Sequence, residues 1–182
     1  MLMINNPLSM VMKKIQEGID SRHSDYHIMN VSYVLNTQIK TSCTVIRNLT
    51  DNAIWFNTDF RSQKVVALEK NNQACLHFYS KKDKIQMSVA CTLVIHHHDD
   101  FTKQAWEKAS LLSKQCYRQI GPPCEAYHEE TAQLKLPLKT AYENFATVEA
   151  TMHTIDVLFL KFGGNERYLI DMHTKHCQSV LP

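Results

Sequence analysis

A hydroxyl and two cations lie close together in the segment 56–64, directly after a short apolar strand pattern. Ser62 stands where a helix would begin, with Arg61 and Lys64 on either side of it. A serine there can cap the helix, and the helix dipole adds positive potential beside both cations. We also expect the amides of residues 65–66 to be free donors in the first turn. The segment therefore predicts a binding site for an anion, with a phosphate ester as the best-fitting ligand.

The composition restricts the classes of protein to which the chain can belong. The 182 residues are 44% hydrophobic, enough for one substantial core, so we expect a single domain over 1–182. The formal charge of +2 comes from well-mixed acidic and basic residues, so nucleic acid is not an expected partner. No apolar run is long enough to cross a bilayer, and the N-terminus lacks a basic leader with a cleavage site. We therefore expect a cytoplasmic protein with no membrane partner.

Cysteine and histidine offer two further possibilities for chemistry. The six cysteines contain no Cys-x-x-Cys pair, and we expect them to be buried, reduced thiols. The run His96-His97-His98 precedes Asp99 and Asp100. Consecutive residues of an extended strand point to opposite faces, so we expect no metal there and a helix capped by Asp99 or Asp100 instead.

Periodicity and turn residues predict an α+β fold, a mainly antiparallel β-barrel with flanking helices. Short connections between the apolar runs favour hairpins, and Gly163-Gly164-Asn165 predicts the last tight turn. The stretch 122–140 has the character of a loop and is our candidate for a lid, although a surface loop without function fits equally well. In the third helix, Phe101, Ala105, Ala109, Leu112 and Cys116 should form the buried stripe. The expected helices are 7–20, 62–71 and 100–117, and the expected strands are 28–36, 41–49, 53–58, 74–80, 84–96, 145–153, 155–162 and 166–171.

Scarcity of glycine excludes several other nucleotide sites. The chain has four glycines, at 18, 121, 163 and 164, so it contains neither a Gly-x-Gly-x-x-Gly loop nor a Walker loop. A Gly-x-Ser-x-Gly elbow is also absent from the sequence. The phosphate site must therefore be built from side chains and a helix end.

Three segments together carry a family resemblance. The strand 44–47, the run TDFRSQKVVALEKNNQACLHFY (58–79) and the run KIQMSVACTLVIH (84–96) resemble the pyridoxamine 5′-phosphate oxidase-like family of FMN-binding split barrels. The resemblance is to the compact branch of this family rather than to the true oxidases. It implies a split β-barrel with FMN as the cofactor, a homodimer with FMN at the interface, and oxidoreductase activity on an unidentified small molecule. A non-catalytic flavin-binding or sensing module and a haem-binding member of the same fold group remain as alternatives.

The resemblance also implies a role for individual residues. Ser62 and Lys64 would hold the FMN phosphate, and Arg61 would replace the charge of an oxidase arginine at the position of Ser42. Asn57 and Thr58 would touch the flavin, and the amide of Gln86 would bond to the polar edge of its ring. The implied cofactor-binding set is Ser42, Thr44, Val45, Arg47, Asn57, Thr58, Arg61, Ser62, Gln63, Lys64 and Gln86.

The expected substrate site departs from that of the true oxidases. Their phosphate-binding tyrosine, arginine and serine fall within 104–114, where this chain has QAWEKASLLSK and no arginine. Arg47 and Arg167 are the remaining candidates for substrate binding, while Leu169 stands where the oxidases have a histidine. We therefore do not expect pyridoxine 5′-phosphate to be the substrate. We expect Trp106 to anchor a helix rather than to stack on the flavin.

Overall fold

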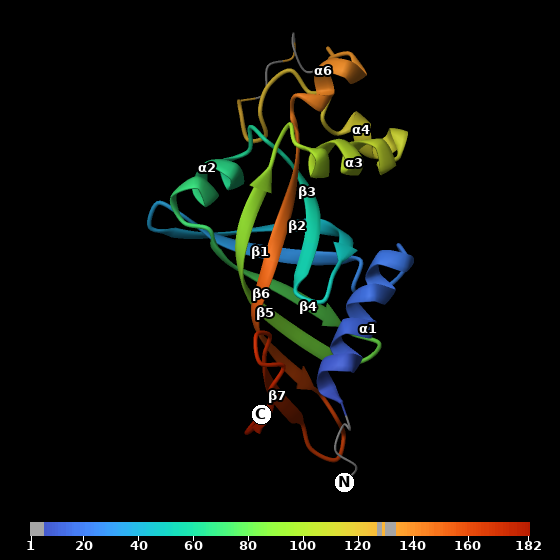
Figure 1. The fold of residues 1–182 in the computed structure, drawn as a ribbon, viewed down its shortest axis with the longest axis vertical. Helices are drawn as coiled ribbons and strands as arrows, with labels where there is room; N and C mark the ends of the chain where they lie inside the picture. The colour runs from blue at the N-terminus through green and yellow to red at the C-terminus, as the bar shows by residue number, and fades with distance from the viewer. Residues whose placement is uncertain (1–5, 127–128, 130–133) are drawn as a thin grey trace.

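Eight antiparallel strands form one continuous sheet in the computed structural model, which describes residues 6–126, 129 and 134–182 (Figure 1). The strands are β1 Ile28–Leu35, β2 Gln38–Leu49, β3 Ala53–Asp59, β4 Gln73–Ser80, β5 Ile85–His96, β6 Phe145–Phe159, β7 Glu166–Asp171 and β8 Cys177–Val180. Their order is β3-β2-β1-β4-β5-β6-β7-β8, and a further pairing of β3 with β6 closes the first six into a barrel. The predicted antiparallel barrel is thus confirmed, with β7 and β8 extending the sheet beyond it.

The helices cover the barrel at its margins. α1 (Pro7–Asp20) is capped by Asn6, whose side chain accepts from the Ser9 amide at 2.9 Å, as expected for an Asn-Pro helix start. α2 (Gln63–Lys70) follows β3 and packs against β1 and β5. The helices α3 (Asp100–Lys108), α4 (Leu111–Gln115) and α6 (Leu138–Tyr142) gather at one end of the barrel (Figure 1). None of the helices in the described ranges has the length and apolar character needed to cross a bilayer.

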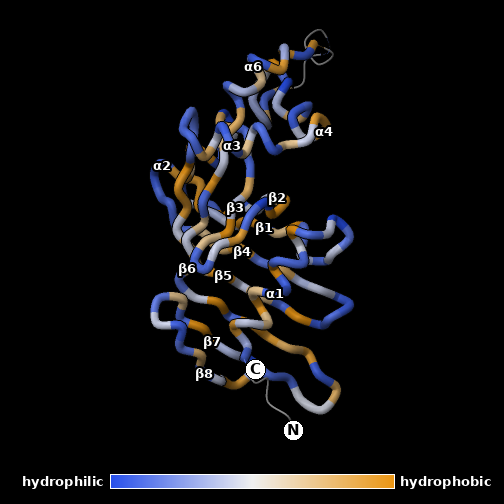
Figure 2. The backbone as a smooth tube through the Cα atoms, turned by 45° about the vertical axis from the view of Figure 1, so that its right-hand side comes forward, coloured by the Kyte–Doolittle hydropathy of each residue, from blue (hydrophilic) through white to orange (hydrophobic). Residues whose placement is uncertain are grey.

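Alternating side chains fill the barrel interior. Figure 2 shows hydrophobic segments concentrated in the strands, whereas many connecting loops are hydrophilic. Ile54 and Phe56 of β3 are fully buried, as are Val11 and Ile15 of α1, and all four belong to one core cluster. Gly18 permits the close approach of α1 to the following chain, because a Cβ at this position would lie 2.3 Å from the Tyr26 carbonyl oxygen.

The expected helix over 100–117 is wrong in one respect. Ala109 and Ser110 both have extended backbone angles, which end α3, and the Ser110 hydroxyl accepts from the Ser113 amide and caps α4. The predicted apolar stripe is also wrong, since Phe101 is 54% exposed and Leu112 is 81% exposed. Trp106 instead packs with Tyr117 and Phe145 in a second hydrophobic cluster, which confirms it as a helix anchor.

Three other expectations need correction. The strands expected at 145–153 and 155–162 are one strand, β6, because the irregular register at His153 bends it without ending it. β8 was not predicted. The cysteines are not uniformly buried, since Cys43, Cys116 and Cys124 are exposed.

Candidate functional site

The β3–α2 turn brings two hydroxyls together at one end of the barrel. Thr58 lies on the inward side of β3, two residues after the buried Phe56, and is 8% exposed. Its Oγ1 is 3.5 Å from Oγ of Ser62, the residue that precedes α2. Strand alternation followed by a helix start therefore places both predicted hydroxyls beside the first turn of α2.

The hydrogen bonds of this first turn differ from those expected. Ser62 occupies the N-cap position, but its side chain makes no capping hydrogen bond. The amides of Val65 and Val66 both donate to the Ser62 carbonyl, at 3.0 and 3.4 Å, so neither is the free donor we expected. Within the described ranges, Gln63 and Lys64 are the first-turn residues whose amides have no backbone acceptor. The hydroxyl of Ser62, which makes no capping bond, and these two amides are donors that the turn offers to an anion.

Lys64 is the central residue of the site. Its side chain is 7% exposed, and its Nζ lies 5.3 Å from the centroid of the Phe56 ring. Among the described residues, no carboxylate forms an ion pair with it and no acceptor bonds to its Nζ. Burial lowers the pKa of Lys64 from 10.5 to about 8. A buried ammonium without a counter-ion is costly, so this position favours an anionic ligand.

Arg61 does not supply the free charge expected of it. Its Nε and Nη2 form a bidentate pair with the carboxylate of Asp59, at 3.0 and 2.8 Å. Its Nη1 and Nη2 also donate to the carbonyls of Ile120 and Gln119. The guanidinium is therefore bound within the protein, and Lys64 is the cation left to meet a ligand at this turn.

The predicted residues of β2 divide between the two faces of the strand. Ser42 and Thr44 pair with the buried Val31 and Met29, so they share the inward face. Val45 faces outward. The Ser42 hydroxyl is buried and has no hydrogen-bond partner in the described structure. Ser42 lies on the strand that pairs with β1, and β1 packs against α2.

Asn57 and Gln86 lie on outward faces rather than beside Lys64. Asn57 alternates with Thr58, and its Oδ1 is buried without a donor among the described residues. Gln86 stands opposite Tyr79 of β4 and Leu158 of β6 on the outer surface of the barrel. No described hydrogen bond joins Gln86 to the β3–α2 turn. Gln86, which was expected to contact the flavin ring edge, therefore lies on a different face of the barrel from the β3–α2 turn, which was expected to bind the phosphate.

The two arginines expected to bind substrate are in different surroundings. Nη2 of Arg47 is 3.4 Å from Oγ of Ser113, which links β2 to α4, and the residue is otherwise exposed. Arg167 forms a bidentate pair with Asp156 of the neighbouring strand, at 2.8 and 2.6 Å, and this partner raises the pKa of Arg167. The charge of Arg167 is therefore already compensated, and Arg47 is the more available of the two.

The side chains of His96, His97 and His98 all contact other residues of the chain. Nδ1 of His96 is 2.6 Å from Oδ2 of Asp99, whose Oδ1 accepts from the Thr102 amide and caps α3, as predicted. His97 stacks on Phe60 at the start of the β3–α2 turn. The described residues contain no cluster of three or more side chains suited to a metal ion. His96 therefore contacts the start of α3, His97 contacts the β3–α2 turn, and His98 contacts Glu143 just after α6.

The sequence did not indicate two residues, Trp55 and Glu149, that lie beside His96 in the structure. The buried Nε1 of Trp55 and Nε2 of His96 have no hydrogen-bond partner among the described residues, and the two rings stack with centroids 5.3 Å apart. Glu149 approaches His96 Nε2 at 3.5 Å, without the geometry of a hydrogen bond. Strand alternation places Trp55 on the outer face of β3, but only the pairing of β3 with β6 brings it beside the other two residues.

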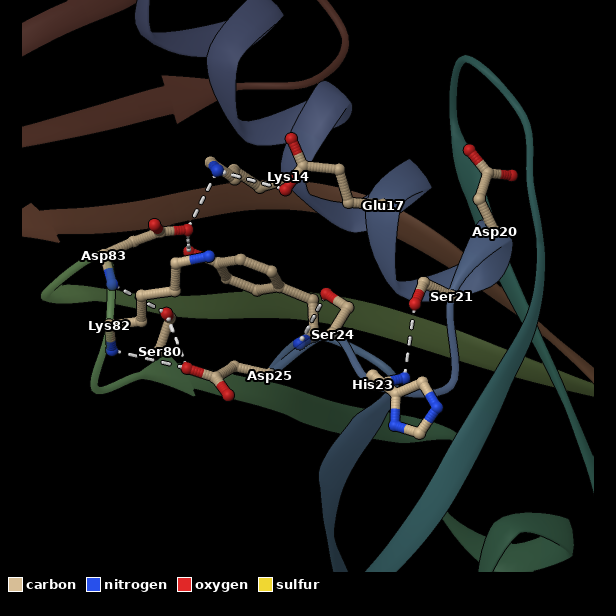
Figure 3. A pocket seen from close by; sticks show the side chains of 11 residues that line it. Lys14, Glu17, Asp20, Ser21, His23, Ser24, Asp25, Ser80, Lys82 and Asp83 are labelled. Atoms are coloured by element: carbon tan, nitrogen blue, oxygen red, sulfur yellow. Dashed lines mark hydrogen bonds and ion pairs between the residues drawn. The ribbon is translucent and has the colours of Figure 1, made fainter.

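A separate cavity of about 360 Å³ lies between α1 and the β4–β5 hairpin (Figure 3). There Nζ of Lys14 is 2.8 Å from Asp83, and Ser80 donates to Asp25 at 2.8 Å. The Tyr26 hydroxyl also donates to Asp83, and the hydrogen bond from Lys14 contributes most to lowering the pKa of Asp83. Carboxylates outnumber lysines in its lining. This cavity is therefore electrostatically unsuited to a phosphate, unlike the β3–α2 turn.

Comparison with solved structures identifies the fold. A pyridoxamine 5′-phosphate oxidase-related, FMN-binding protein from Nostoc punctiforme aligns with a TM-score of 0.76 and 16% identity, covering 99% of this chain and 100% of that one. PhzG from Burkholderia lata, in complex with tetrahydrophenazine-1-carboxylic acid, aligns with a TM-score of 0.77 and 11% identity over 99% and 94% of the two chains. A protein related to general stress protein 26 from Clostridium acetobutylicum gives 0.61 and 13%, over 93% and 96%.

The comparisons define a class of fold. No family model matches the sequence. No curated protein matches it either. At 11% to 16% identity, the structural alignments establish the fold of the chain and leave its ligand to be argued from the site. The chain has the fold of the FMN-binding split barrels related to pyridoxamine 5′-phosphate oxidase, as the sequence resemblance implied.

Proposed function

We propose that the protein binds FMN through the β3–α2 turn. The observation that carries this proposal is Lys64, a buried cation without an anionic partner in the described structure. The hydroxyls of Thr58 and Ser62 and the amides of the first turn of α2 would share the phosphate with it. The orphaned Ser42 hydroxyl is a further candidate contact from β2. A single helix start can hold one phosphate, which favours FMN over a dinucleotide.

We further propose that the protein is a flavin-dependent oxidoreductase acting on a small molecule. FMN, when bound, supplies hydride transfer, so the chain need not provide a strong acid–base group of its own. Gln86 offers an uncharged donor and acceptor for the polar edge of the flavin ring. Asn57 offers a buried acceptor, Oδ1, for a ligand hydroxyl or N–H. Arg47 would bias the entrance toward an anionic or electron-rich substrate.

A homodimer with FMN at the interface belongs to the same proposal. Gln86 lies on an outer sheet face that also carries Ile28, Tyr79 and Leu169, which are 56%, 48% and 42% exposed. A flavin held on this face would remain open to solvent unless another surface covered it. A second copy of the chain can bury both the apolar side chains and the ring. In one subunit, Gln86 and the phosphate-binding turn lie on separate faces. In a dimer, the two subunits together could contact both the ring and the phosphate of one flavin.

The visible spectrum of freshly purified protein tests the proposal. We expect flavin bands, and mass spectrometry of the released chromophore should give FMN. Lys64→Ala should weaken FMN binding by about 1.5 to 3 kcal/mol, because a charged hydrogen bond to phosphate is lost. Recovery of FAD or haem would contradict the proposal. Bound FMN that no electron donor reduces would instead favour the non-catalytic flavin-binding module.

A further inference from the structure

The carboxylate of Asp59 holds the β3–α2 turn in one conformation. Its Oδ1 accepts from both the amide and the Nε of Arg61, at 2.9 and 3.0 Å, while Oδ2 accepts from Nη2 at 2.8 Å. The Ser62 amide donates to the Asp59 carbonyl at 3.0 Å. The two charged side chains are only 10% and 22% exposed. One carboxylate thus fixes both the backbone leading into Ser62 and the direction of the arginine.

The guanidinium of Arg61 extends from this turn to a distant part of the chain. Nη1 donates to the Ile120 carbonyl at 2.8 Å, and Nη2 donates to the Gln119 carbonyl at 3.2 Å. Gln119 forms a β-bridge with Lys135, and the next amide, that of Leu136, donates to the Arg118 carbonyl. We call these two paired pieces, residues 118–120 and 135–136, the stem. Arg61 is therefore a direct link between the stem and the anion-binding turn.

The chemistry of this link requires arginine. A planar guanidinium can bond to a carboxylate with one edge and to two carbonyls with its remaining N–H groups, whereas a lysine ammonium cannot reproduce that fork. The pairing also compensates the charges of Asp59 and Arg61 within the turn. Holding the turn in advance lowers the entropy lost when a ligand binds.

We propose that Asp59 and Arg61 are positioning residues of the anion site and couple its occupation to the order of the stem. The inference rests on the proposed function, because the anion is the FMN phosphate. Neither side chain needs to touch the phosphate, since Asp59 acts through the backbone and Arg61 acts through Asp59 and the stem. Coupling of this kind is reciprocal, so a bound phosphate should stabilise the stem and an intact stem should strengthen phosphate binding.

The test compares Arg61→Lys and Asp59→Asn with the wild-type protein, using Arg118→Lys as the matched control. Arg118 also holds the stem, donating from Nε to the Leu136 carbonyl at 2.5 Å, but it does not reach the β3–α2 turn. Affinities for FMN and for riboflavin, which lacks the phosphate, are measured by flavin fluorescence. Hydrogen exchange of peptides covering the turn and residues 118–120 is followed with and without FMN.

We expect Arg61→Lys and Asp59→Asn to weaken FMN binding about tenfold and to leave riboflavin binding within about twofold. FMN should slow exchange at residues 118–120 in the wild type and in Arg118→Lys, but not in Arg61→Lys. Equal losses for riboflavin, or unchanged FMN protection of the stem in Arg61→Lys, would overturn this inference alone. A wild-type protein that binds no FMN would overturn the proposed function as well.

Discussion

Replacing Lys64 by methionine should make the ligand-free protein more stable and its FMN complex weaker. The pKa of Lys64 is lowered from 10.5 to about 8, which corresponds to a cost of about 3 kcal/mol for holding the ammonium in the folded state. The contact with the Phe56 ring offsets part of this cost, by about 0.5 to 2 kcal/mol. Methionine has a similar length and no charge, so we expect a gain of about 1 to 3 kcal/mol at pH 7.

The pH dependence of this gain follows from the two pKa values. Below pH 8, Lys64 is protonated in both the folded and the unfolded chain, so the full cost is present. Between pH 8 and 10.5 the folded state releases the proton first, so the contribution of Lys64 to stability rises with pH. Above 10.5 both states are neutral and the cost is gone. The advantage of Lys64→Met should therefore shrink steadily between these pH values.

Urea denaturation of the ligand-free proteins at pH 7 and pH 10 measures the effect. Lys70→Met is the matched control, because Lys70 is an exposed lysine in the last turn of the same helix. We expect Lys70→Met to change stability by less than about 0.5 kcal/mol at either pH. The reasoning fails if Lys64→Met is no more stable than the wild type at pH 7, or if its FMN affinity is unchanged.

Three further predictions concern the ligand and the assembly. FMN affinity should fall by up to about tenfold per pH unit above pH 8, as Lys64 loses its proton, whereas riboflavin affinity should stay level; parallel titrations by fluorescence compare the two. Leu169→Glu should give monomers with weaker flavin binding in sedimentation experiments, while Leu112→Glu, on the exposed surface of α4, should remain dimeric; a dimeric Leu169→Glu would place the interface elsewhere. Pyridoxine 5′-phosphate should not bleach the bound flavin under anaerobic conditions, because residues 104–114 lack an arginine and Arg167 is paired with Asp156; rapid bleaching would show that these features do not govern recognition.

Local signals in the sequence predicted the strand and the helix starts that position the site. The alternation of Phe56 and Thr58 assigns them to one face of β3, and the polar turn before Val65 marks the start of α2. Asn6-Pro7 and Asp99 were likewise correct as helix starts. These features depend on neighbouring residues along the chain, so periodicity and capping chemistry are sufficient to read them.

Features that depend on distant segments were decided only by the tertiary structure. Nothing near Arg61 in the sequence indicates that the carbonyls of Gln119 and Ile120 will meet its guanidinium. The burial of Lys64 without a counter-ion also depends on distant segments, because desolvation of the ammonium is caused by many atoms that the fold brings around it. The sequence by itself determined which side chains stand at the β3–α2 turn. Long-range packing determined which of the two cations is bound within the protein and which is left to attract an anion.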